Sequence, residues 1–339
     1  MNKFFDIKRT RMTDDAAFRH NPVQPGKTAL IFILVYFVSG LLSSIIPGIV
    51  SSVYTMSKIV KSGLWAEYTA AAGAADAVGA ENALIKISEY ALTIQTPWWQ
   101  TAVELFATAI MAGGAIFYCL KKEKRPFKSL GLRGGKSVVS ECVLGFGIGV
   151  LITAMIAGFS FATTSLSFTF NNSFSWAFIL LIPACLVSAI ADEIFWRGYL
   201  MTSLARDTAP IKSIFIMAII YAVFHISLNP ILMVNAFIFA FFMGVYVFKR
   251  GSIWGASIIN FVWTYATAVI FGSHVPGINN APSVLTAVFV RLDSISGGEL
   301  YGFLGGLSFT LILVISTSIL LLTKTKTKEI SDFTIDYFA

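Results

Sequence analysis

Two adjacent carboxylates and a guanidinium lie within a long apolar segment of this 339-residue chain. Asp192 and Glu193 are followed by Arg197, among mostly apolar neighbours. A charged side chain at the centre of a membrane helix costs about 2.5 to 3.5 kcal/mol, and such residues usually mark a pathway or a catalytic site. Glu193 and Arg197 stand four positions apart on one helix face, where they can form an ion pair. A purely structural ion pair between helices is the alternative interpretation.

A histidine at matching depth follows in the next apolar segment. We expect an antiparallel helical hairpin that turns at 207–210. Glu193 lies about 15 residues before this turn and His225 about 16 after it, so each is roughly 22 to 24 Å from the turn. Tyr221 lies one helical turn from His225 on the same face. A lone histidine in a membrane helix is often only a hydrogen-bonded packing residue, but a carboxylate at equal depth favours a shared site.

A third polar pair, Asn260 and Thr264, is again spaced four residues apart in an apolar segment. The three pairs offer a general base in Glu193, a histidine that could share that task or bind a metal, and amide and hydroxyl donors for an oxyanion. Hydrolysis by activated water is the reaction class that this set indicates. Asn235, in another apolar segment, is better explained by a hydrogen bond between helices.

The composition indicates an integral membrane protein that must position these residues on helices. Hydrophobic residues make up 56% of the chain and charged residues 13%, with a mean hydropathy of +0.76, whereas a soluble domain has about 25% charged residues. We therefore expect an all-α, polytopic membrane bundle of about eight transmembrane helices. The apolar runs long enough to cross a bilayer lie at 28–50, 99–120, 138–162, 177–203, 211–228, 230–248, 252–272 and 300–323.

The distribution of basic residues predicts the orientation of these helices. If both termini are cytoplasmic, 21 of the 25 Lys and Arg residues fall on the inside, as the positive-inside rule requires. The net charge of +7 is thus a topology signal and not a sign of nucleic-acid binding. No cleavable signal peptide is expected, because the first 27 residues are polar and basic. The three cysteines, Cys119, Cys142 and Cys185, are interpreted as apolar packing residues.

This topology divides the chain into five parts. The first is a cytoplasmic basic tail at 1–27, and the last is a cytoplasmic tail at 324–339. Between them we expect N-terminal transmembrane helices at 28–176, a core at 177–272, and an outside loop with the last transmembrane helix at 273–323. The outside loop at 51–98 within the second part is expected to hold short interfacial helices. The segments 163–175 and 272–298 are interpreted as connections.

The order and spacing of the motifs resemble the CPBP family of intramembrane proteases (CAAX protease and bacteriocin-processing, also called Abi), over about 177–272. The usual family motifs are Glu-Glu-x-x-x-Arg, Phe-x-x-x-His and His-x-x-x-Asn. The resemblance implies that Glu193 is the water-activating carboxylate, that Arg197 is its structural partner and that His225 is the second-motif histidine. Asp192 in place of the first Glu and Tyr221 in place of Phe are mild departures.

The third motif departs further from the family, because Asn260 stands where the family has His and Thr264 where it has Asn. Asparagine has no titratable group and is a poor metal ligand, although it can still donate a hydrogen bond to an oxyanion. His20, in the cytoplasmic tail, and His274, in an outside loop, are not obvious replacements. A divalent metal such as zinc would have Glu193 and His225 as ligands, but zinc usually takes three or four protein ligands, so the sequence alone does not support it.

The favoured hypothesis is an intramembrane endopeptidase that cleaves a membrane-associated, prenylated or bacteriocin-like peptide with water activated by Glu193 and His225. Its partners would be a membrane-embedded or lipidated peptide, or a membrane protein, and the lipid bilayer, with no nucleic acid. Two alternatives stay open: a pseudoprotease that acts as a membrane scaffold or in immunity, and an ion-coupled transporter. The resemblance and the compact basic loops fit a multi-pass protein of a bacterial plasma membrane.

Overall fold

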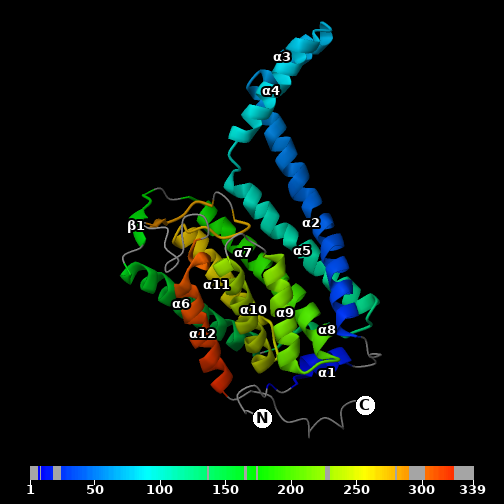
Figure 1. Cartoon of the computed structure of the whole chain (residues 1–339), viewed down its shortest axis with the longest axis vertical. Coiled ribbons are helices and arrows are strands. Elements are labelled where there is room, and N and C mark those ends of the chain that lie inside the picture. Colours follow the sequence, from blue (N-terminus) through cyan, green and yellow to red (C-terminus); the bar gives the residue numbers. More distant parts are fainter. Residues whose placement is uncertain are drawn as a thin grey trace.

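The computed structural model describes residues 7, 9–17, 24–135, 137–163, 166–172, 175–225, 230–278, 281–289 and 302–323. Within these residues the chain forms a bundle of helices with one small sheet (Figure 1). The expectation of an all-α membrane bundle is therefore confirmed. His20 and the expected tail at 324–339 lie outside the described residues, which also cover only part of the tail at 1–27.

Five helices are long and apolar enough to cross a membrane. They are α2 (Pro25–Lys61), α5 (Trp98–Lys121), α6 (Ser137–Ala162), the continuous helix of α7 (Ala177–Glu193), η3 (Ile194–Met201) and α8 (Thr202–Ala205), and α10 (Pro230–Arg250). Three shorter apolar helices occupy the other expected positions: α9 (Pro210–Phe224), α11 (Trp254–Tyr265) with its extension η4 (Ala266–Ile270), and α12 (Leu307–Leu322). The described residues thus support five spans by length and composition, and the expected number of eight is not confirmed.

The first long helix extends well beyond the expected span at 28–50. α2 contains 37 residues and is therefore about 55 Å long. The expected loop at 51–98 accordingly begins as helix, and its remainder forms a helical hairpin of α3 (Leu64–Gly73) and α4 (Ala77–Thr93) at the far end of α2 (Figure 1). Asp76 caps α4, because its side chain accepts a hydrogen bond from the Gly79 N–H.

We call the end of the bundle at which α2 begins the basal end, and the end that carries the α3–α4 hairpin the distal end (Figure 1). At the basal end, α1 (Arg11–Ala17) packs against α8 and the short helix η2 (Phe127–Leu130). A buried arginine joins these connections to the core, since Arg125 donates hydrogen bonds to the side chains of Ser129 and Ser203 and to the Gly198 carbonyl oxygen. This network anchors the basal half of η3 on the loop that follows α5.

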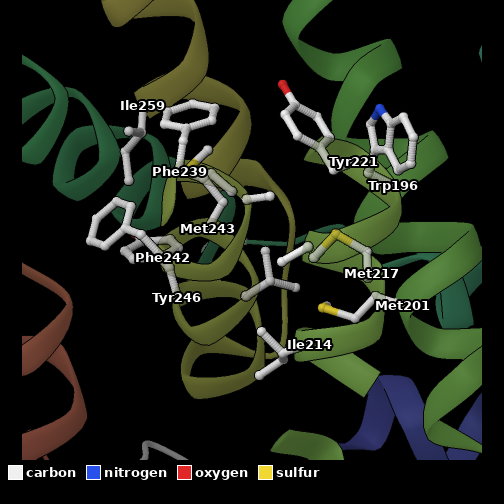
Figure 2. Close-up of a cluster of buried hydrophobic side chains, with 14 of the residues drawn as sticks. Trp196, Met201, Ile214, Met217, Tyr221, Phe239, Phe242, Met243, Tyr246 and Ile259 are labelled. Carbon is white, nitrogen blue, oxygen red and sulfur yellow. The ribbon is translucent and has the colours of Figure 1, made fainter. Parts of the chain in front are cut away.

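The central core lies between η3, α9, α10 and α11 (Figure 2). Met201, Met217 and Met243 meet there, and the aromatic side chains of Trp196 and Tyr221 lie at one edge of the cluster (Figure 2). α10 is the most enclosed of the five long helices, with 67% of its most apolar window buried, compared with 17% for α2. The apolar face that α2 leaves exposed is suited to contact with lipid.

Glycines allow α6 to approach α11 closely. A Cβ atom built on Gly145 would lie 2.9 Å from the Gly255 Cα atom, and one built on Gly149 would lie 2.9 Å from the Val262 Cβ atom. Small residues spaced four apart permit such backbone contact between membrane helices. This contact fixes the position of α11, which carries Asn260 and Thr264.

The two segments expected to be simple connections carry a two-stranded antiparallel sheet. β1 (Leu166–Phe170) pairs with β2 (Leu285–Phe289), with Leu166 opposite Phe289. Both strands contain β-branched and aromatic residues, which favour strands, but the loop around β1 is rich in Ser, Thr and Asn and so conceals this signal in the sequence. A further short segment, η5 (Phe303–Gly305), leads into α12.

Candidate active site in a polar cavity

The acidic motif lies where the α-helix of α7 changes to the π-helical turn η3. Single π-helical turns within longer helices often occur at functional sites. The Arg197 Nη1 atom lies 3.0 Å from the Glu193 Oε1 atom, and both side chains are 0% exposed. Glu193 and Arg197 therefore form a fully buried ion pair within one helix. Glu193 Oε2 and Arg197 Nε have no hydrogen-bond partner among the described residues.

Asp192 lies on the open side of this ion pair. Its side chain is 32% exposed, and its Oδ2 atom is 3.9 Å from Arg197 Nη1. The Nδ2 atom of Asn260, on α11, donates a hydrogen bond of 3.1 Å to the same oxygen. Thr264 Oγ1 in turn donates to Asn260 Oδ1 over 3.4 Å. The first and third sequence motifs are thus joined through Asp192 and Asn260.

His225 is held at the end of α9, which ends one residue earlier, at Phe224, and so before the end of the expected span at 211–228. Its Nδ1 atom lies 2.8 Å from the Tyr221 carbonyl oxygen. A carbonyl oxygen can only accept, so Nδ1 donates this hydrogen bond, and in the neutral imidazole the lone pair is on Nε2. The imidazole stacks on the Tyr221 ring at 4.1 Å, and the Arg197 guanidinium lies 5.3 Å from the centre of that same ring. Tyr221 therefore contacts both His225 and the guanidinium of the buried ion pair.

A cavity of about 410 Å³, which is within the size range of small-ligand sites, is lined by Asp192, Tyr221, His225, Asn260 and Thr264. Its wall is largely apolar and includes Tyr36, Phe195, Trp196, Phe239 and Trp263. Besides Tyr36 of α2 and Tyr221 of α9, the polar and titratable side chains on its wall come from α5, α7, α9, α11 and the loop after η4: Glu104, Thr108, Cys185, Ser188, Asp192, His225, Asn260, Thr264 and His274.

Four of the six residues proposed from the sequence therefore share this cavity, namely Asp192, His225, Asn260 and Thr264. The other two, Glu193 and Arg197, are packed behind its wall. Asn235 lies elsewhere and makes a structural contact, since its Nδ2 atom donates to the carbonyl oxygens of Leu304 and Gly306.

Two further residues of the cavity were not assigned to the site from the sequence: Glu104, which was not considered, and His274, which was set aside as part of an outside loop. Glu104 is the only charged residue of the expected span at 99–120, and an ionisable residue in such a span is itself a signal of function. His274 lies in the loop after η4, beside a turn in which Val275 pairs with Ile278. That loop folds back onto the bundle and reaches the cavity, which spacing along the sequence could not reveal.

The side chains present do not fit a zinc site. No group of three or more His, Cys, Asp or Glu residues in the described part of the chain is arranged to hold a metal ion. Glu193, one of the two ligands considered from the sequence, is paired with Arg197 inside the helix. Asn260 stands in the position where the resemblance implies a second histidine, and zinc sites in proteins take at least three protein ligands.

Comparison with known families supports the relationship that the motifs suggest. Residues 174–266, about a quarter of the chain, match the model of a family described as Rce1-like, type II CAAX prenyl endopeptidase. The match spans the acidic motif, His225 and both polar residues of α11. It confirms the expected resemblance to CAAX proteases and agrees with the preference for a hydrolytic enzyme. No curated protein matches the chain.

Proposed function

We propose that this protein is an intramembrane endopeptidase in which Asp192 and His225 activate a water molecule inside the cavity. The observation that carries the proposal is the hydrogen bond from Asn260 to Asp192, which joins two motifs at the cavity wall. The match of residues 174–266 to an endopeptidase family supports the same reaction class. The cavity is large enough for several residues of an extended peptide.

The geometry favours Asp192 as the carboxylate that touches the water, in place of Glu193. A general base must come within about 3 Å of the proton that it abstracts. Asp192 is partly exposed to the cavity, whereas Glu193 is enclosed and bound to Arg197. Glu193 is accordingly a positioning residue: it holds Arg197, whose guanidinium lies beside both Asp192 and the Tyr221 ring.

In the proposed reaction, Asp192 accepts a proton from water as the water oxygen bonds to the peptide carbonyl carbon. The carbonyl oxygen becomes an oxyanion, and Asn260 has one N–H left to donate to it, since the other binds Asp192. The C–N bond then breaks as the leaving nitrogen takes up a proton. Asp192 and His225 line one cavity, so the proton that Asp192 has accepted can pass to this nitrogen through the Nε2 atom of a neutral His225.

The proposed substrate is a membrane-embedded or lipidated peptide, since the cavity lies within helices that are suited to span a bilayer. A prenylated or bacteriocin-like peptide would satisfy this description. We place the basal end in the cytoplasm, because the basic residues of the loop after α5 and the pair Lys249 and Arg250 lie there. A bacterial plasma membrane fits this arrangement.

Proteolysis in liposomes tests the assignment. Purified protein is reconstituted and offered a set of fluorogenic peptides, some of them prenylated, and the same assay is run with Asp192→Asn and with Glu89→Gln, an exposed carboxylate on α4. The Asp192→Asn change should lower kcat by about 10² to 10⁴, which is the usual contribution of a general base. Glu89→Gln should cleave like wild type. Undiminished cleavage by Asp192→Asn overturns its role, and a wild-type protein that binds but never cleaves these peptides overturns the endopeptidase assignment.

A further inference from the structure

Glu104 is an acidic residue in a helix long enough to cross a membrane. It has no role in the proposed reaction. It lies on α5 and lines the cavity, and none of the described residues forms a hydrogen bond or an ion pair with it. Glu141, the acidic residue of α6, differs in this respect because both of its oxygens accept hydrogen bonds from Arg250. A charged group in a bilayer-spanning helix is expensive unless it is paired or functional. We therefore expect the partner of Glu104 to be a group of the ligand that binds in the cavity.

The charge of the cavity wall indicates the nature of that partner. Two carboxylates, Glu104 and Asp192, face the space, and no Lys or Arg is among the described residues that line it. Arg197, the nearest guanidinium to Asp192, is fully buried and bound to Glu193. A cavity with acidic groups and apolar walls favours a cation with an aliphatic stem and disfavours an added carboxylate.

We propose that Glu104 is a specificity-determining residue that binds a cationic side chain, Lys or Arg, of the peptide substrate. The inference deepens the proposed endopeptidase function and rests on it. Glu104 would form a charge-assisted hydrogen bond with the substrate ammonium or guanidinium at the cavity wall. The substrate cation would then pair with Glu104 as Arg250 pairs with Glu141.

The helices set the distance between this contact and the bond that is cut. Leu105 of α5 packs in the same cluster as Leu181 and Cys185 of α7, so Glu104 lies near the depth of these residues. Asp192 follows Cys185 by seven residues and Leu181 by eleven, which places it roughly 10 to 16 Å further along the helix. An extended peptide covers about 3.3 to 3.6 Å per residue. The cation should therefore lie roughly three to five residues from the scissile bond, on one side of it.

The face of α5 below Glu104 supports this path. Thr108 and Met111 follow at intervals of four and three residues, and both line the cavity. Together with Glu104 they form a continuous strip along α5 that leads toward Asp192. Ser188 of α7 faces the same space between Cys185 and Asp192. A peptide in this strip can hold its cation at Glu104 while its carbonyl group reaches Asp192.

The test measures kcat/KM in liposomes for one cleavable peptide in which Lys, Gln or Glu is placed in turn at each of six positions on both sides of the scissile bond. For the wild type, Lys should exceed Gln by about 10-fold at one position or two neighbouring positions, and Glu should be cut more slowly than Gln. Glu104→Gln should remove the preference, and Glu104→Lys should reverse it toward Glu. The matched control Glu81→Gln, an exposed carboxylate on α4, should keep the wild-type preference.

A binding measurement separates failure of this inference from failure of the endopeptidase assignment. Fluorescently labelled Lys, Gln and Glu peptides are titrated into the catalytically blocked Asp192→Asn variant, with and without Glu104→Gln. A preference for Lys that depends on Glu104 supports the inference whether or not wild type cleaves the peptides. Equal binding and equal cleavage of the three peptides, or a Lys preference that survives Glu104→Gln, overturns it and leaves the hydrolytic role of Asp192 intact.

Discussion

Asn260 donates a hydrogen bond of 3.1 Å to Asp192 across the interface of α11 and α7, and it has a second N–H that this bond does not use. An asparagine at this position can therefore orient the carboxylate and face an oxyanion at the same time. A histidine could supply a proton there, but the amide offers two donors in fixed directions. Although Asn260 departs from the third family motif, its amide can thus still orient Asp192 and donate a hydrogen bond to an oxyanion.

The first prediction concerns this amide. Asn260→Ala should lower kcat by about 10² to 10³, the usual effect of removing one oxyanion donor. Asn260→Asp has nearly the same shape, but it loses both N–H groups and brings a carboxylate next to Asp192, so it should be at least as inactive at neutral pH. Single-turnover cleavage rates in liposomes provide the measurement. If Asn260→Asp retains wild-type rates, the amide has no such role.

The second prediction concerns the buried ion pair. Glu193→Gln leaves the buried Arg197 guanidinium with only the more distant Asp192 as a counter-ion, which should destabilise the protein by up to about 3 to 5 kcal/mol. The exposed pair of Glu67 and Lys86 provides the matched control, because Glu67→Gln should change stability by less than about 1 kcal/mol. Unfolding of both variants in the same detergent, followed by tryptophan fluorescence, gives the comparison. Equal stability of the two variants would contradict the structural role of Glu193.

Asp192 and Glu193 also show which features of the site could be predicted from the sequence and which could not. Spacing along the chain placed three polar pairs on three helices at one depth, and the structure brings Asp192, His225, Asn260 and Thr264 to one cavity. Spacing could not decide which of two adjacent carboxylates faces the cavity. That choice depends on the rotation of the helix at the change from α7 to the π-helical turn η3, which a regular period of 3.6 residues does not describe.

Two other features depended on contacts that are remote in the sequence. The segment 51–61 is rich in Ser, Val, Tyr and Thr, which are weak helix formers, yet α2 continues through it to Lys61 and contacts α3 and α4. The pairing of β1 with β2 joins segments more than a hundred residues apart, and the loop between η4 and β2 brings His274 to the cavity as it returns. Such long-range pairing leaves little trace in local composition.

The third prediction concerns His274, which lies outside the helices that span the bundle. Partial burial lowers the pKa of His274 below its ordinary value of 6.5, because the charged imidazolium is poorly solvated there. The folded protein consequently binds this proton less readily than the unfolded chain. Its contribution to stability is complete above about pH 6.5 and is lost as the pH falls toward the lowered pKa.

His274→Gln should therefore reduce the loss of stability between pH 7 and pH 5. The measurement is the thermal midpoint of wild type and variant across that range in one detergent. Glu104, Asp192 and His225 face the same cavity and are unchanged in both proteins, so a difference between the two curves reports on His274. Parallel curves for the two proteins would contradict this role of His274.

The fourth prediction concerns the contact that positions α11. Gly145→Ala adds a methyl group that would lie 2.9 Å from the Gly255 Cα atom, where backbone cannot yield without moving the helix. We expect a loss of about 1 to 3 kcal/mol in stability, the usual effect of overpacking. Because Asn260 lies on the displaced helix, the rate of cleavage should fall as well, even at temperatures where the variant is folded.

Gly147→Ala provides the control on the same helix, since a Cβ atom there meets nothing within 4 Å. Alanine is the better helix former by roughly 0.5 to 1 kcal/mol, so this variant should be as stable as wild type or slightly more stable. The two variants differ only in the position of one methyl group. If both keep wild-type stability and cleavage, the close approach of α6 and α11 does not position Asn260; if Gly145→Ala alone loses both, helix packing sets the geometry of the Asp192 and Asn260 contact.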